Sequence, residues 1–333
     1  MKTGIIFAGQ GAQYPGIGRS LYDNYPEARA VFDAAGAEIK GWCFEGSKEL
    51  LRQTHVTQPA VYAMTMAAWA AFKGGFDKLA KDDGDGLEIA AMAGFSLGEY
   101  AALAAAGCME AFPAGLSIVR KRGVFMAEAG TDAEGNPKGG MAAVFGEREK
   151  ILNCIEMIRE GSVLEAVNFN SPEQTVAAGD LEAVDRLKKQ AREFGLKALT
   201  LKVSAAFHSS MMIPAADRME RELADLSFRA PGIPVYSNVT GKELRANQGK
   251  EISDSEWIKS RMVLQLKSPV YWQETIENMH EDGVELFVEI GPGRTLSGLV
   301  KKIVPDAETA HVEDAESLEN ALKVIRTKRS ANR

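Results

Sequence analysis

One short stretch restricts the fold more than any other part of the chain, the segment AMAGFSLGEYAAL at 91–103. The apolar residues at 87–94 predict a buried strand, and the alanine-rich residues up to Gly107 predict a helix. Ser96 lies at the junction, with a glycine two residues to either side. A sharp turn from strand to helix needs small residues at those positions, because backbone segments approach closely there. The segment therefore predicts one unit of a parallel α/β sheet.

Other segments agree with a parallel α/β sheet. Helical spacing of apolar residues recurs at 21–39, after Pro59 and from Ser317 to about Lys328, and the polar stretch 78–88 predicts a loop. Further buried strands are predicted at 3–9, 234–239 and 284–291.

The middle of the chain has a different order of elements. Strands are predicted at 141–145, 163–170, 174–179 and 197–203, with one helix at 147–160 and another that ends at Gly195. The order β-α-β-β-α-β is typical of a ferredoxin-like unit. We therefore predict an α/β fold in which a hydrolase-like parallel-sheet core domain, 1–130 and 203–333, carries an inserted ferredoxin-like α+β subdomain, 131–202.

Composition narrows the class of protein. The formal net charge of −7 argues against general nucleic-acid binding. The three cysteines, Cys43, Cys108 and Cys154, are odd in number and far apart, which favours buried free thiols in a reducing compartment. The apolar region 89–106 is interrupted by polar residues and glycine, and the apolar start is too short for a signal peptide. We expect a cytoplasmic protein with no membrane span.

Ser96 is a candidate nucleophile. A serine hydroxyl reacts at neutral pH only if it is exposed to substrate, has a base and faces donors for a developing oxyanion. A strand-to-helix turn projects the hydroxyl out of the sheet and directs backbone N–H groups toward the reacting oxygen. The alternative is a chance G-x-S-x-G pattern in a chain that contains 32 glycines.

The base must be sought among four histidines. His208 lies in VSAAFHSSMM, a loop of small and apolar residues after a predicted strand, and it fits either a base or a structural histidine. His55, His280 and His311 lie in polar or charged segments, which is typical of surface positions. A serine esterase or thioesterase of the α/β-hydrolase type is the main rival, because Asp306 and His311 follow Ser96 in the required order. A catalytically idle interaction protein is a second alternative.

Several motifs resemble one known family in their order along the chain. They include FAGQGAQ near the start, GFSLGEYAAL, KRGVFM, GGMAAVFG, AVNFNSPEQTVAAG, VSAAFHSSMM, PVYSNVTG, QLKSPVYW and VEIGPGRTLSGLVKKI. The chain resembles the malonyl-CoA:acyl carrier protein transacylases, which act in fatty-acid and polyketide synthesis. The resemblance runs nearly end to end, and that family also has an inserted ferredoxin-like unit.

The resemblance implies a role for each site residue. Ser96 would be acylated, His208 would act as base and then acid, and the side-chain carbonyl of Gln265 would orient His208. The backbone N–H groups of Gln10 and Leu97 would form the oxyanion hole. The reaction would transfer malonyl from malonyl-CoA to the phosphopantetheine thiol of an acyl carrier protein by a ping-pong mechanism, without a metal or other cofactor. A monomer is expected.

Two more residues would set the choice of acyl group. Arg122 would hold the free carboxylate of malonate, because a guanidinium can bind a carboxylate with two hydrogen bonds. By residue type alone, 120–122 also fits a solvated basic helix face. Phe207 beside the base would crowd a methyl-branched substrate, although a plain core position fits it too. Phe95 stands where many relatives have histidine, which leaves the fatty-acid or polyketide branch open.

Overall fold

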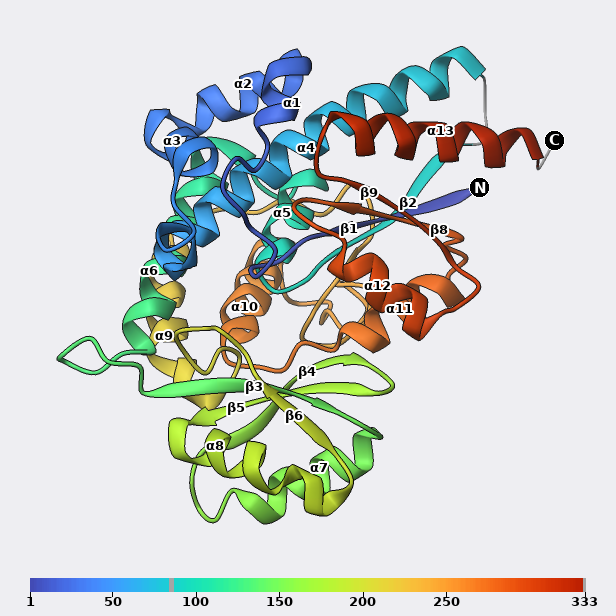
Figure 1. Cartoon of the computed structure of the whole chain (residues 1–333). Helices are drawn as coiled ribbons and strands as arrows, with labels where there is room; N and C mark the ends of the chain where they lie inside the picture. The colour runs from blue at the N-terminus through green and yellow to red at the C-terminus, as the bar shows by residue number, and fades with distance from the viewer. Residues whose placement is uncertain (84–86, 332–333) are drawn as a thin grey trace.

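The structure, a computed structural model, describes residues 1–83 and 87–331. It contains a five-stranded parallel sheet and a four-stranded antiparallel sheet, which lie in different parts of the molecule (Figure 1). The antiparallel sheet and its two helices form the lower part of Figure 1. The predicted α/β fold with a parallel-sheet core and an inserted ferredoxin-like α+β subdomain is therefore confirmed.

The parallel sheet contains every strand predicted for the core domain. Its order is β7-β2-β1-β8-β9. The bounds are β1 (Lys2–Phe7), β2 (Glu88–Gly94), β7 (Val235–Tyr236), β8 (Leu286–Ile290) and β9 (Glu308–Val312). The sequence does not predict β9, because it is an edge strand with mixed polar side chains in which only Val312 is buried. Strand pairing with β8, rather than local hydrophobic pattern, fixes this segment.

Helices cover both faces of the parallel sheet. In β1, Ile5 and Phe7 belong to one apolar core and Ile6 to another, which also contains Trp272 of α11 and Leu296 of α12. This alternation follows from the two-residue period of a strand. The helix bounds in this part are α1 (Arg19–Asn24), α2 (Pro26–Ala35), α3 (Ala37–Glu45), α4 (Thr54–Asp83), α5 (Leu97–Ala105), α6 (Leu116–Ala129), α9 (Ile213–Leu223), α10 (Asp254–Leu266), α11 (Trp272–Glu281), α12 (Thr295–Ile303) and α13 (Ala315–Ala331).

The predicted loop at 78–88 is wrong over most of its length. Helix α4 continues to Asp83, and β2 begins at Glu88; residues 84–86 lie outside the described residues. The helix continues because Phe76 and Leu79 extend its buried apolar face, and Gly75 allows close contact with Leu322 of α13. Tertiary packing thus overrides the polar composition of the segment.

The antiparallel sheet has the predicted ferredoxin-like order of elements. They are β3 (Gly139–Phe145), α7 (Arg148–Ile158), β4 (Leu164–Ser171), β5 (Gln174–Asp180), α8 (Leu181–Gln190) and β6 (Lys197–Thr200), with the strand order β4-β5-β3-β6. Strand β6 is shorter than the predicted 197–203, and most of its side chains are exposed. All six elements lie inside the predicted subdomain 131–202, whose exact limits stay a prediction.

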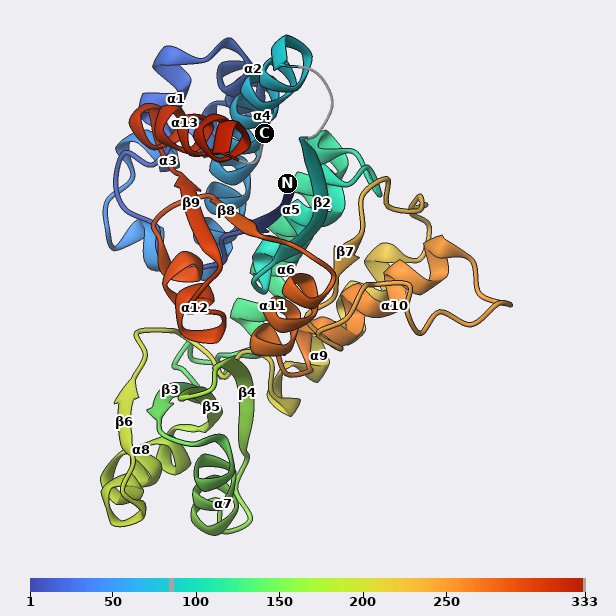
Figure 2. The same cartoon turned by 90° about the vertical axis from the view of Figure 1, so that its right-hand side faces the viewer.

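The two faces of the antiparallel sheet contact different parts of the molecule. In β3, Ala142 and Val144 pack in a core with α7 and α8, whereas Met141 and Ala143 belong to the core of the larger part. Figure 2 shows the second sheet beneath the larger part, with α7 and α8 on its far side. Backbone bonds across the junction, from Val270 N–H to Val167 O at 2.8 Å and from Phe169 N–H to Val270 O at 2.9 Å, fix β4 against the larger part.

Candidate active site

A cavity of about 400 Å³ lies between the two parts of the molecule. Gln10, Ser96 and Arg122 line it from the larger part, and Asn168 and Val176 line it from the antiparallel sheet. The cavity therefore opens at the ends of β1 and β2, the edge where parallel sheets commonly bind ligands.

Ser96 sits on a strained turn between β2 and α5. Its φ of 51° lies in the left-handed region, which residues with a side chain rarely adopt. The flanking glycines are required by contact: a Cβ on Gly94 would lie 1.9 Å from the backbone carbon of Gly98, and one on Gly98 would lie 2.1 Å from the carbonyl oxygen of Phe7. The predicted reason for both glycines, close backbone approach, is confirmed.

Asn238, which follows β7, holds this turn from the side. Its Oδ1 accepts the Ser96 N–H at 2.7 Å, and its Nδ2 donates to the Gly94 carbonyl at 2.7 Å. The sequence did not single out Asn238 as a site residue. The signal in the sequence was a polar residue, Asn238, within the predicted buried strand PVYSNV. A polar side chain that is buried there must find hydrogen-bond partners.

His208 contacts Ser96 across 112 residues of sequence. Its Nε2 lies 2.7 Å from the Ser96 hydroxyl oxygen, and its Nδ1 lies 2.9 Å from the backbone carbonyl of Gln265. A carbonyl only accepts, so Nδ1 carries the proton and Nε2 is free to accept the serine proton. The φ of His208, 64°, is also left-handed, so both partners are held in uncommon backbone conformations.

The predicted contact from the side chain of Gln265 to His208 is wrong. The backbone carbonyl of Gln265, at the end of α10, makes that bond instead. The side chain is occupied elsewhere: Nε2 donates to the Ser96 carbonyl at 2.8 Å and to Glu99 Oε2 at 2.9 Å. Its Oε1 accepts from Arg122 Nη2 at 3.2 Å. The prediction named the right residue, since Gln265 does contact His208. Its side-chain amide, however, cannot bond to these three partners and to His208 together.

Burial keeps His208 neutral. Only 4% of the residue is exposed. Desolvation, with the positive charge of Arg122 nearby, lowers the pKa of His208 from 6.5 to about 4, and the bond to the Gln265 carbonyl opposes this shift. At neutral pH the imidazole is therefore unprotonated and able to take a proton from Ser96.

Arg122 is a buried cation beside the serine. It is 1% exposed, and it donates to Ser96 Oγ at 3.1 Å and to Gln58 Oε1 at 2.8 Å. Its guanidinium carbon lies 5.0 Å from the centre of the Tyr100 ring. Among residues 1–83 and 87–331, no carboxylate forms an ion pair with Arg122, and its buried Nε has no hydrogen-bond partner. Burial lowers its pKa. Tyr100 and the charge of Glu99 oppose this shift, and the unpartnered Nε–H leaves a donor for an anion that binds there.

The neighbouring basic residues of α6 face solvent, as predicted. Arg120 pairs with Glu38 at 2.5 Å, and Lys121 pairs with Glu222. Both pairs are exposed, so they contribute little to stability. Only Arg122 of the three turns to the cavity.

Three other predicted residues lie at or beside the cavity. Gln10 and the buried Phe207 line it, and Leu97 is the first residue of α5, directly after Ser96. The N-terminal N–H groups of a helix lack partners inside the helix, so Leu97 N–H is available to an oxyanion. The oxyanion role of Gln10 and Leu97 and the selectivity role of Phe207 stay predictions.

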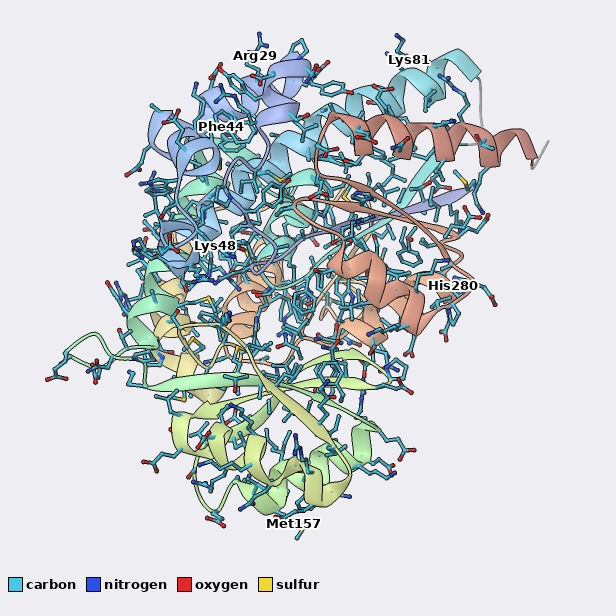
Figure 3. The ribbon with its side chains drawn as sticks, in the orientation of Figure 1. Arg29, Phe44, Lys48, Lys81, Met157 and His280 are labelled. Carbon is cyan, nitrogen blue, oxygen red and sulfur yellow. The ribbon has the colours of Figure 1, made fainter. Side chains whose placement is uncertain are left out.

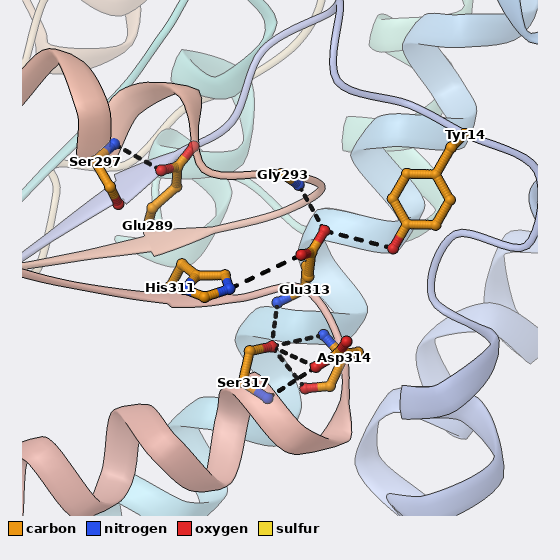
Figure 4. Close-up of polar contacts among 8 residues, drawn as sticks. All are labelled: Tyr14, Glu289, Gly293, Ser297, His311, Glu313, Asp314 and Ser317. Atoms are coloured by element: carbon orange, nitrogen blue, oxygen red, sulfur yellow. Dashed lines mark hydrogen bonds and ion pairs between the residues drawn. The ribbon is translucent and has the colours of Figure 1, made fainter.

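The other histidines lie away from Ser96. His311 Nε2 is 3.8 Å from Glu313 Oε1, and Figure 4 shows both in a polar cluster with Tyr14, Asp314 and Ser317. His280, labelled in Figure 3, is exposed, and its Nδ1 lies 2.9 Å from the Val284 carbonyl. His55 is exposed on the first turn of α4. The arrangement that an esterase with Asp306 and His311 would require is therefore not formed.

The chain matches known proteins along almost its whole length. A family model described as "Acyl transferase domain" matches residues 5–329. The malonyl CoA-acyl carrier protein transacylase of Bacillus subtilis (strain 168) is 36% identical over 332 residues, which are 98% of this chain and 98% of that protein. The chain belongs to the malonyl-CoA:acyl carrier protein transacylase family.

Solved structures of this transacylase family agree with the fold. The malonyl CoA-acyl carrier protein transacylase of Clostridium perfringens matches with a TM-score of 0.86 and 36% identity, over 100% of this chain and 99% of that chain. A malonyl-transacylase in complex with its type II PKS acyl-carrier protein, PlMCAT:AntF, matches with a TM-score of 0.84 and 35% identity, over 97% and 99% of the two chains. The chain is thus an acyltransferase.

Three further observations complete the description of the chain. Within residues 1–83 and 87–331, no group of three or more His, Cys, Asp or Glu side chains is arranged to hold a metal ion. None of the helices in the same residues combines the length and the apolar character that a membrane crossing requires. All three cysteines are free and buried, as predicted.

Proposed function

We propose that the chain transfers malonyl from malonyl-CoA to the phosphopantetheine thiol of an acyl carrier protein. The observation that carries this proposal is Arg122, a buried guanidinium that touches Ser96 Oγ and pairs with no carboxylate among the described residues. An acyl group with its own carboxylate would supply the missing anion. Membership of the transacylase family supports the same substrate and acceptor.

The first half-reaction acylates Ser96. His208 Nε2 takes the serine proton while Oγ attacks the thioester carbonyl. The negative oxygen of the tetrahedral intermediate accepts hydrogen bonds from the N–H groups of Gln10 and Leu97. The intermediate then breaks its carbon–sulfur bond, and protonated His208 gives its proton to the leaving CoA thiolate.

The second half-reaction runs in reverse with another thiol. His208 takes the proton of the phosphopantetheine thiol, and the thiolate attacks the malonyl-serine ester. Collapse of this intermediate breaks the carbon–oxygen bond and returns the proton to Ser96. The residues of the site supply every proton transfer, so we propose that no metal or other cofactor takes part.

Two proposals concern selectivity and assembly. Arg122 fixes the malonyl carboxylate, and Phe207 beside His208 limits room for a methyl branch. Ser96, His208, Arg122 and Gln265 all come from one chain, which supports a monomer as the active form; light scattering after gel filtration tests this. The three free cysteines support a reducing compartment such as the cytoplasm.

The decisive experiment follows the fate of the malonyl group. Intact-mass measurement after addition of malonyl-CoA is expected to show malonyl on Ser96, and then on a carrier protein when one is added. Free malonate formed as fast as malonyl-carrier protein would instead support a thioesterase. A well-folded protein that gains no adduct would support an idle interaction protein.

Replacement of the cation tests the acyl group. Arg122→Ala is expected to lower kcat/KM for malonyl transfer by about 100-fold or more, because a buried charge-assisted pair is lost. Transfer of acetyl, which has no carboxylate, is expected to persist or rise. Arg120→Ala, on the exposed side of α6, is the matched control and should change neither. Equal loss of malonyl and acetyl transfer in Arg122→Ala would contradict the proposed carboxylate site.

A further inference from the structure

Glu99 is a buried carboxylate beside the active site that the proposed reaction does not use. It lies on the first turn of α5 and is 2% exposed. Gln265 Nε2 donates to its Oε2 at 2.9 Å, and the Asn238 N–H donates to the same oxygen at 3.0 Å. Burial raises the pKa of Glu99 to about 7. A buried carboxylate costs stability, so its retention calls for a role.

Three donors surround Glu99: Gln265, the Asn238 N–H and the side chain of Ser237, with the charge of Arg122 nearby. The bonds from Gln265 and Asn238 converge on Oε2, which remains an acceptor even when a proton lies on Oε1. These two bonds therefore need an acceptor at Oε2 and form whether or not the carboxyl group is ionised.

The side-chain amide of Gln265 is thereby given a single orientation. The Ser96 carbonyl and Glu99 Oε2 both accept hydrogen bonds, so both require the NH₂ group of Gln265. Its oxygen must then face Arg122 Nη2, which it meets at 3.2 Å. The opposite orientation would place two acceptors against each other and an NH₂ group against a guanidinium.

Gln265 also separates the two charged groups. No ion pair joins Glu99 and Arg122 in the part of the chain that the structure describes, because the amide lies between them. A direct pair would neutralise Arg122 and compete with an acyl carboxylate. The amide instead gives the guanidinium a neutral acceptor, so the charge of Glu99 acts on Arg122 only through space and without a contact between them.

We propose that Glu99 is a positioning residue that acts through Gln265: it fixes the amide, and the amide holds Arg122 unpaired beside Ser96. This inference rests on the proposed function, because it concerns the grip on the malonyl carboxylate. Its signature is a change in the ratio of malonyl to acetyl kcat/KM, since a purely structural defect lowers both activities in parallel.

Three variants test the relay. Gln265→Met removes the amide but keeps the backbone carbonyl that orients His208, and it should lower the malonyl-to-acetyl ratio about tenfold. Glu99→Met should lower the ratio by a similar factor, mainly through a higher KM for malonyl-CoA. Glu99→Gln retains an acceptor and should stay within about threefold of the wild-type ratio. Asp180→Asn is the control. The Asp180 carboxylate accepts the Val163 N–H in the antiparallel-sheet part, so its replacement should not alter the malonyl-to-acetyl ratio.

A double-mutant cycle decides whether Glu99 acts through Gln265. In the Gln265→Met background, Glu99→Met should lower the ratio no further, because the relay is already broken. Thermal melts identify any variant that fails to fold, and Gln265→Met then carries the test alone. The inference is overturned if Gln265→Met keeps the wild-type ratio, if the two substitutions add, or if Glu99→Gln is as impaired as Glu99→Met.

The same measurements separate this inference from the proposed function. Wild-type protein must first load malonyl on Ser96, and Arg122→Ala must lose the preference for malonyl. If either fails, the proposed function fails. If both hold while the Glu99 and Gln265 variants behave like wild type, only the relay is wrong.

Discussion

Two regions of the molecule each place a histidine near a serine, and they have opposite surroundings. Around Ser96, His208 is buried, faces a cavity and has a backbone carbonyl and a cation as neighbours. Around Ser317, His311 is half-buried and has an acidic partner, Glu313 (Figure 4). Judged by residue types alone, the second region resembles a Ser-His-acid triad more closely.

The serine of the second region has a different task. Ser317 Oγ accepts the N–H groups of Glu313 at 3.0 Å and Asp314 at 2.9 Å, and it donates to Asp314 Oδ1 at 2.6 Å. These bonds close the first turn of α13 and leave the hydroxyl no free position. The difference teaches that a strained turn facing a cavity, an unprotonated base and a cation without a carboxylate partner identify a reactive serine better than an acidic partner does.

The largest expected effect is on the rate of Ser96 malonylation, which should depend on His208 and not on His311. His208→Ala should lower the rate of Ser96 malonylation by about 1000-fold or more, because the serine loses its base. His311→Ala should leave that rate within about twofold. Stopped-flow or quench-flow detection of the malonyl adduct measures both. A larger loss in His311→Ala than in His208→Ala would reverse the comparison.

The next contrast compares the backbone of the Ser96 turn with that of an exposed position on α12. Gly98→Ala should destabilise the fold by about 3 kcal/mol or more, because its Cβ would meet the Phe7 carbonyl oxygen at 2.1 Å, a backbone atom that cannot move aside. Gly298→Ala, at an exposed position of α12, would place its Cβ within 4 Å of no atom beyond its chain neighbours and the adjoining helix backbone, and should stabilise the fold by up to about 1 kcal/mol. Urea unfolding of the two variants gives both values. If the two substitutions destabilised the fold equally, the backbone contacts at the Ser96 turn would not be unusually close.

The smallest effect is a pH dependence that only His208 should show. Because its folded pKa, about 4, lies below 6.5, the unfolded state binds more protons as pH falls through this window. Wild-type stability relative to His208→Ala is therefore complete above pH 6.5 and declines below it. The acid limb of kcat/KM should likewise lie below pH 6.5 and be unchanged by His311→Ala. An acid limb above pH 6.5 would contradict a desolvated, neutral imidazole.

Local patterns were sufficient for much of the fold. The strand–turn–helix at Ser96 depends on a buried strand, two small residues and a helix, all visible within fifteen or so positions. The ferredoxin-like order was equally visible, because each of its elements carries its own apolar period. Edge strand β9 and the extension of α4 to Asp83 were not, since pairing with β8 and packing against α13 decide them.

By itself, the sequence determined which residues gather at the site. Ser96, His208, Arg122 and Gln265 were named from their motifs, and the structure brings them into contact. Only the tertiary structure decided how they are used. It assigned the backbone of Gln265 to His208 and its side chain to Arg122, added Gln58, Glu99 and Asn238, and left Arg122 without a carboxylate partner among the described residues. These outcomes depend on which donors and acceptors meet in a buried space, and residue spacing does not encode that.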